Sequence, residues 1–139
     1  MLISVNAGND GAAGTAVWFP RNPEGPMPAK YLFIVSMDVA PDKEALFNEV
    51  YAEHIGYILK VPGVRGTTRA KTEVGTTMVG SERKALTGEG EPTYTAIYEL
   101  DSPDILMSQA WRDATEAGRW ATQVRPYTTN RRHILRKVI

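Results

Sequence analysis

Beyond residue 30 the chain alternates between two hydrophobic periods, one typical of strands and one typical of helices. Residues 31–35 are apolar and rich in β-branched and aromatic side chains, which predicts a buried strand. A helix is predicted next, with Pro41 in its first turn, where a missing N–H needs no partner, and with Pro62 and Gly63 ending it. One face of that helix carries apolar residues at steps of three or four, with a histidine among them: Phe47, Val50, His54, Ile58 and Val61.

The next stretch predicts a strand and a long connection. Residues 64–73 alternate so that basic side chains, Arg69 and Lys71 among them, share one face. We expect this basic face to meet solvent, at a sheet edge or on an open sheet face. Residues 74–92 are rich in glycine and polar side chains, which predicts a long hairpin connection, with a helical turn possible between residues 78 and 86.

The last third of the chain predicts two strands around a second helix. Residues 93–100 alternate as a strand with two tyrosines on one face. The Ser-Pro-Asp sequence at 102–104 is typical of a helix start and predicts a helix over about residues 103–117. Residues 127–138 predict a final strand, whose sequence RRHILRK is interpreted as an exposed basic strand. Trp111 and Trp120 are interpreted as packing residues or dimer contacts.

This order of elements defines a fold class. Strand, helix, strand, strand, helix and strand form an α+β ferredoxin-like βαββαβ sandwich, in which a four-stranded antiparallel sheet carries both helices on one face. We expect one such domain over residues 30–139. Its other sheet face is uncovered and includes apolar side chains, which favours a homodimer formed by packing sheet on sheet.

Residues 1–29 differ from the rest of the chain. They are rich in glycine and proline, follow neither period, and hold one apolar cluster of Val17, Trp18 and Phe19. The segment is interpreted as a flexible N-terminal extension, as termini of this composition commonly are. The alternative is an arm that docks Trp18 and Phe19 on its own domain or on a partner subunit.

Composition narrows the class of protein further. Sixteen basic residues balance sixteen acidic ones, so no overall charge attracts the protein to nucleic acid or to a membrane surface. The chain has no cysteine, which excludes disulfides, thiolate metal ligands and cysteine nucleophiles. No apolar run reaches the roughly 18 residues of a membrane helix, and the N-terminus lacks a signal-peptide pattern. We therefore expect a cytoplasmic protein without nucleic-acid or membrane partners.

Three stretches carry a resemblance to a known superfamily. The sequence FNEVYAEHIGYILKVPGV, with its histidine and its PGV ending, resembles the signature of the EthD-like and related dimeric α/β-barrel proteins. PTYTAIYELDSPDILMSQAW and RPYTTNRRHILRKV are similar to the second half of the same group. The resemblance spans about residues 30–138. It implies a dimeric α/β barrel and a pocket between sheet and helices that holds His54. Its members include cofactor-free monooxygenases, polyketide cyclases, isomerases, lyases and haem-degrading enzymes.

His54 is the candidate catalytic residue, as an acid or base. A neutral imidazole accepts a proton near neutral pH, and a nearby phenol or guanidinium can stabilise an oxyanion. The residues expected to bind substrate beside it are Tyr51, Tyr57, Ile58, Arg69 and Tyr98. Purely structural alternatives stay open: His54 could be a hydrogen-bonded core histidine, Tyr98 a packing residue and Arg69 a solvated residue at a sheet edge. Only two histidines exist, far apart in sequence, so we expect no metal site and no cofactor.

Two function classes follow. The first is a cofactor-independent enzyme, of the monooxygenase, cyclase, isomerase or lyase type, acting on a small aromatic or polyketide-like molecule. The second is a non-catalytic dimeric module that binds a small apolar ligand or has a structural role. Nucleic-acid binding is a third and weaker reading, because the strands lack the ribonucleoprotein motif and the net charge is zero.

Overall fold

The computed structural model describes residues 2–3, 17–18 and 28–139. Within its first part, strand β1 (Leu2–Ile3) pairs antiparallel with β2 (Val17–Trp18). Residues 1, 4–16 and 19–27, Phe19 among them, lie outside the described residues. The choice between a flexible extension and a docking arm therefore stays a prediction.

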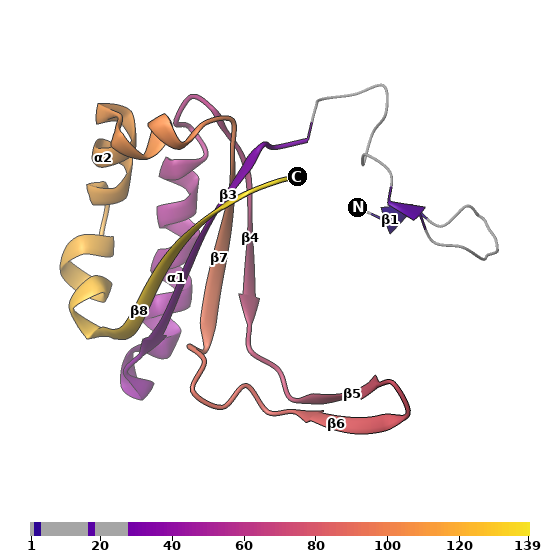
Figure 1. Cartoon of the computed structure of the whole chain (residues 1–139). Helices are drawn as coiled ribbons and strands as arrows, with labels where there is room; N and C mark the ends of the chain where they lie inside the picture. Colours follow the sequence, from indigo (N-terminus) through magenta and orange to yellow (C-terminus); the bar gives the residue numbers. More distant parts are fainter. Residues whose placement is uncertain (1, 4–16, 19–27) are drawn as a thin grey trace.

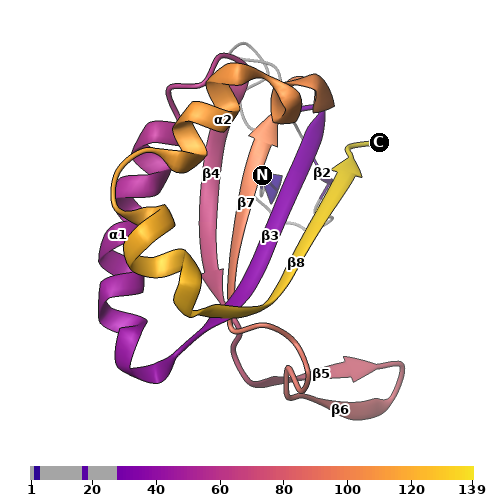
Figure 2. The same ribbon diagram turned by 90° about the vertical axis from the view of Figure 1, so that its left-hand side faces the viewer.

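The domain is a four-stranded antiparallel sheet with its helices on one face, as the sequence predicts (Figures 1 and 2). The strands lie in the order β4–β7–β3–β8, so the two edge strands are the second and the last of the predicted four. The elements are β3 (Tyr31–Val39), a 3₁₀ turn (Pro41–Lys43), α1 (Glu44–Ile58), β4 (Val64–Lys71), β5 (Gly75–Val79), β6 (Glu82–Leu86), β7 (Tyr94–Leu100), a 3₁₀ turn (Pro103–Met107), α2 (Gln109–Glu116), a π-helical turn (Trp120–Val124), a 3₁₀ turn (Arg125–Tyr127) and β8 (Thr128–Lys137).

The core lies between α1 and the sheet. All five residues of the predicted helix face are buried, and so is Tyr51 beside them. They meet the inward face of β7, whose alternate residues, beginning with Tyr94 and ending with Leu100, are buried as well. Helical and strand periods therefore identify the same interface from its two sides.

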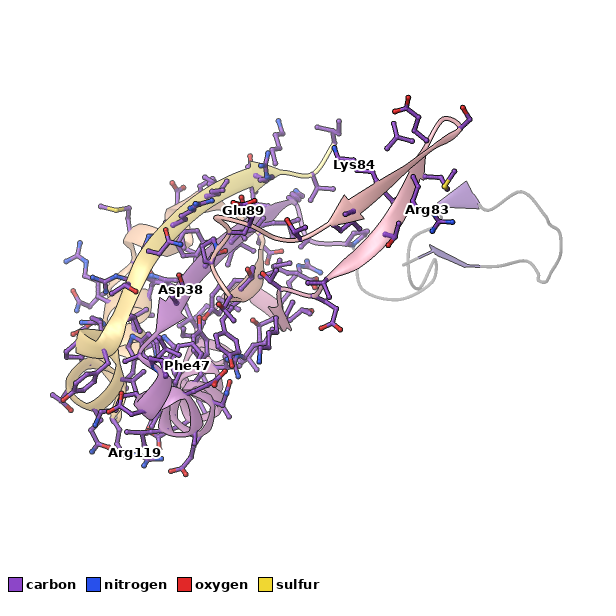
Figure 3. All side chains as sticks on the ribbon, turned by 90° about the horizontal axis from the view of Figure 1, so that it is seen from below. Asp38, Phe47, Arg83, Lys84, Glu89 and Arg119 are labelled. Atoms are coloured by element: carbon purple, nitrogen blue, oxygen red, sulfur yellow. The ribbon has the colours of Figure 1, made fainter. Side chains whose placement is uncertain are left out.

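Two local predictions are wrong. The second helix is not continuous over 103–117, because Ser108 adopts an extended conformation and its hydroxyl accepts a hydrogen bond from the backbone N–H of Trp111, which starts α2 anew. The turn expected between residues 78 and 86 is not helical. Strands β5 and β6 pair there as a hairpin that projects from the end of the sheet on the side away from the helices (Figure 1). Arg83 and Lys84 lie on this hairpin, outside the body of the domain (Figure 3).

The solvent-facing assignment of the basic face of β4 also needs correction. β4 is an edge strand, as one of the alternatives had it. However, Arg69 pairs in register with Ala96, whose side chain is buried against the helices. Arg69 therefore lies on the helix side, and Thr68 and Ala70 lie on the open side of the sheet.

The open face of the sheet carries a row of apolar side chains. Ile34 of β3 pairs in register with Ile97 of β7 on one side and with Ile134 of β8 on the other. Thr68 of β4 extends this isoleucine row to the far edge of the sheet. No described helix covers this face (Figure 1). An apolar row of this kind across a whole sheet is typical of an interaction surface.

Gly63, in the PGV sequence, has no room for a side chain. Its φ of +92° is strained for other residues, and a Cβ there would overlap the side chain of Ile105. Gly63→Ala should therefore lower the free energy of unfolding by about 2–3 kcal/mol. Gly80→Ala is the matched control, because Gly80 has a similar positive φ of +61° but nothing within 4 Å of the added Cβ. Urea unfolding measures both, and equal losses would show that the contact with Ile105 adds nothing.

Among the helices that the structure describes, none has the length and apolar character needed to cross a bilayer. The cytoplasmic location stays a prediction.

Candidate functional site

A cavity of about 170 Å³ opens between α1, the sheet and the segment that follows α2. The sheet contributes residues of β3, β7 and β8, and the helical layer contributes the rest. The lining residues are mostly aromatic or apolar, with two arginines and two histidines among them: Phe33, Val35, Met37, Tyr51, His54, Ile58, Tyr98, Trp111, Thr115, Trp120, Arg125, Arg131 and His133.

His54 lies at the centre of the helical wall of this cavity. Its imidazole stacks on the indole of Trp120, with ring centroids 4.7 Å apart and planes 24° from parallel. The ring of Tyr51 meets it edge-on at 5.6 Å. The residue is 6% exposed, and its Nδ1 is buried without a hydrogen-bond partner among the described residues. A buried polar atom without a partner is costly, so the interpretation of His54 as a satisfied core histidine does not hold for this nitrogen.

The surroundings of His54 keep it neutral. Burial disfavours the charged imidazolium and is the main reason that its pKa falls from 6.5 to about 4. The guanidinium of Arg125 lowers the pKa further, while the carboxylate of Glu116 opposes this effect. At neutral pH the imidazole is therefore an uncharged ring with one nitrogen free to accept a proton.

Two phenols form the neighbouring wall. The hydroxyl oxygens of Tyr51 and Tyr98 lie 3.4 Å apart in a buried hydrogen bond. Burial raises the pKa of both phenols, so both stay protonated and able to donate. The guanidinium of Arg69 lies over the ring of Tyr51, 4.4 Å from its centroid, and donates to the side-chain oxygen of Asn48 at 2.9 Å. Protonated phenols that face a cavity can stabilise an oxyanion formed within it.

The structure brings together four of the six candidate site residues. His54, Tyr51, Ile58 and Tyr98 line the cavity. The other two do not line it. Arg69 lines a second hollow of about 190 Å³ with Asn48, Ala70, Lys71 and Tyr94. Tyr57 lies beside Gly118, where an added Cβ would come within 2.8 Å of its ring.

Several lining residues were not among the predicted site residues. Trp111 and Trp120 were expected to be packing residues or dimer contacts; Trp120 is part of the buried core and Trp111 packs against it, and both also form cavity walls. Arg131 and His133 belong to a strand predicted to be exposed and basic, and β8 is exposed from Thr129 onward, but these two residues also line the cavity. The pairing of His133 with Val35 places it on the helix side of the sheet, where its ring stacks on Phe33 at 5.9 Å. The alternation of residues along β8 predicts that Arg131 and His133 share one face of the strand. Only the register with β3 shows that this face is the helix side of the sheet.

Metal ligands do not gather at the site. Across the described residues, no three His, Asp or Glu side chains lie close enough together to hold a metal ion.

Comparison with known proteins defines the fold class. No protein-family model and no curated protein sequence matches the chain. Several solved structures, however, match its fold. A variant of SnoaB, a cofactor-independent oxygenase from Streptomyces nogalater, aligns with a TM-score of 0.52 and 18% identity over 79% of this chain and 93% of that one. MhuD, a haem degrader from Mycobacterium tuberculosis solved with two haems in its active site, aligns with a TM-score of 0.51 and 16% identity over 78% and 95%.

The chain thus has the ferredoxin-like α+β fold of these proteins, which confirms the predicted fold class. The more specific EthD-like assignment rests on the sequence resemblance alone. At these identities the likeness concerns the fold, and the activity must be argued from the site.

Proposed function

We propose that the protein binds a small aromatic or polyketide-like molecule beside His54 and converts it without a cofactor, with His54 as the proton acceptor. The observation that carries this proposal is the buried, unpaired Nδ1 of His54 on the wall of an aromatic cavity. A ligand hydroxyl or an acidic C–H placed at this atom would supply its missing partner.

The size of the cavity selects among ligands. An engineered cavity of about 150 Å³ holds one benzene ring, so a cavity of about 170 Å³ suits a one-ring or two-ring molecule better than a tetrapyrrole. Trp111 and Trp120 offer flat apolar walls for such a ring. The size therefore favours the oxygenase, cyclase, isomerase or lyase alternatives over haem degradation.

The chemistry expected of the chain's own residues is proton abstraction. The proton of an enolisable or phenolic group passes to the imidazole of His54, and the ligand becomes an enolate or phenolate. The Tyr51–Tyr98 pair can donate a hydrogen bond to that oxyanion. An oxygenase reaction would take molecular oxygen as second substrate, while a cyclase or isomerase would return the proton to another atom of the ligand.

A ligand screen tests this proposal. Phenols, naphthols, quinones and small aromatic acids are screened by thermal shift against wild type and His54→Ala. At 100 times its Kd a ligand stabilises the folded state by about 2.7 kcal/mol, which moves the melting temperature by several degrees. We expect His54→Ala to lose most of that shift. Val50→Ala is the matched control, since Val50 is buried on the same helix but does not line the cavity: it should melt lower and keep the full shift.

Equal ligand-induced shifts of the melting temperature in wild type and His54→Ala would show that His54 does not contribute to ligand binding. A screen without any shift would favour the structural alternative.

A second candidate function, a ligand-binding module without turnover, has one observation in its favour. The pKa of about 4 makes His54 a weak base in the empty cavity. Incubating the best ligand with the protein and following substrate and oxygen consumption separates the two. Binding without consumption, at a protein concentration equal to that of the ligand, would establish the module.

We further propose that the protein is a homodimer formed through the open sheet face. The isoleucine row gives that face a self-complementary apolar centre, as an isologous interface requires. The β5–β6 hairpin supports the same arrangement. It projects on the side of the open face, and Met78, Val79 and Leu86 on it are exposed (Figure 1). A two-stranded hairpin is marginally stable by itself, so a second subunit beside it would stabilise it.

A further inference from the structure

The charged residues that line the cavity are of one sign. Arg125 and Arg131 line it, and no aspartate or glutamate is among its described lining residues. Arg125 is already neutralised: its guanidinium makes two hydrogen bonds to the carboxylate of Glu116, one of them 3.2 Å long, and a third to the carbonyl of Thr115. This leaves Arg131 as the charge to be explained.

Arg131 has no carboxylate partner in the described part of the chain, whereas Arg132, the next residue, pairs with Glu91. Arg131 is exposed, but it also lines the cavity, where its unpaired cation adds a positive potential that a ligand of opposite charge can neutralise.

The backbone is shaped so that Arg131 meets the cavity. The register of β8 against β3 shifts between Ser36 and Asp38, so residues 130–131 of β8 lie opposite the single residue Met37. Asn130 adopts a φ of +52°, uncommon for a residue other than glycine, and its amide donates to the carboxylate of Asp38 at 3.1 Å. Bulges of this type redirect side chains and are frequent beside binding sites.

We propose that the ligand is an aromatic carboxylate, whose carboxylate pairs with the guanidinium of Arg131 while its ring lies in the aromatic part of the cavity, near His54. This inference rests on the proposed function and names its substrate class: a one-ring or two-ring aromatic acid that carries a hydroxyl or an enolisable group. His133, on the same face of β8 as Arg131, is placed to donate a further hydrogen bond to the carboxylate.

A bound carboxylate would also assist the chemistry at His54. The cation of Arg125 contributes to the low pKa of His54 in the empty cavity. A negative charge brought in by the ligand opposes that effect and raises the pKa of His54, which makes the imidazole a stronger base only when the ligand is present. Binding and proton abstraction would then be coupled through the charge of the ligand.

Matched pairs of ligands test the inference. Hydroxynaphthoate and naphthol share a ring system, as do hydroxybenzoate and phenol, and differ in the carboxylate. Their binding is followed by the fluorescence of the cavity residues Trp111 and Trp120. We expect wild type to bind each acid about tenfold more tightly than its neutral partner, equivalent to about 1.4 kcal/mol. Arg131→Gln should bring the ratio to about one and leave the Kd of the neutral partner unchanged.

Arg112→Gln is the matched control, because Arg112 is exposed on α2 and does not line the cavity; it should keep the tenfold ratio. Binding of acid and neutral ligand with equal Kd, or an unchanged ratio in Arg131→Gln, would overturn the inference and leave the proposed function standing. Naphthyl phosphate that binds more tightly than hydroxynaphthoate, with the same dependence on Arg131, would overturn the choice of a carboxylate. Failure of all four ligands to bind would contradict the inference and the proposed function together.

Discussion

Lowering the pH from 7 to 4 is expected to reduce the free energy of unfolding by about 3 kcal/mol through His54 alone. The unfolded chain binds a proton at the ordinary histidine pKa of 6.5, whereas the folded protein resists protonation until about pH 4. The contribution of His54 to stability is therefore fully present above pH 6.5, is lost as the pH falls from 6.5 to about 4, and changes no further below that. Urea unfolding at pH 7, 5.5 and 4, at fixed protein concentration, measures the loss.

His54→Phe isolates this effect from that of other groups. Phenylalanine fills a similar volume, has no proton to bind and leaves no unpaired nitrogen, so the variant should be at least as stable as wild type at pH 7. Between pH 7 and 4 it should lose about 3 kcal/mol less than wild type. His133→Phe leaves His54 in place and should therefore keep the loss of about 3 kcal/mol that is attributed to His54. If the free energy of unfolding of His54→Phe depended on pH as that of wild type does, water would have to reach the imidazole of His54 in the folded state.

The fold could be predicted from sequence because each element carries its own period. The face of α1 around His54 and the alternation of β7 each define a buried surface, and the order of elements leaves one common topology. The break at Ser108 could not be seen in this way. Ser-Pro-Asp at 102–104 is a strong helix start, and nothing in the helical period shows that a second cap follows six residues later.

The candidate site was predictable on its helix and in part on β7. His54 and Tyr51 follow from the helical period and Tyr98 lies on the tyrosine face of the predicted strand, since residues of one face are known from spacing alone. Residues contributed by β8 depend on register: a shift by one residue exchanges the two faces of a strand, and the bulge at Asn130 is such an irregularity. Arg131 thus had the same sequence signal as Arg132, which is equally exposed but does not line the cavity. The charge of the cavity lining, on which the proposed substrate class depends, could be recognised only from the register of β8 with β3.

The second large effect is expected at the open face of the sheet. Ile34→Lys places a charge at the centre of the isoleucine row, and a twofold axis would bring two such charges together in an apolar interface. Burying like charges costs several kcal/mol, so the dimer dissociation constant should rise by at least about a hundredfold. The fold of the subunit should survive, because this side chain points away from the core between sheet and helices. Sedimentation or light scattering at micromolar concentration should show a wild-type dimer and a mutant monomer.

The control for this experiment is Ala52→Lys, which adds the same charge to an exposed position of α1 and should leave the dimer intact. A monomeric wild type would disprove the proposed assembly. A dimeric Ile34→Lys would instead place the interface on another surface, with the hairpin as the next region to test. The ligand measurement can then be repeated on the monomeric variant. If the monomeric variant still binds the aromatic acid through Arg131, the dimer serves stability. If it does not, the second subunit must support the strand that carries Arg131, since β8 is an edge strand with only β3 beside it.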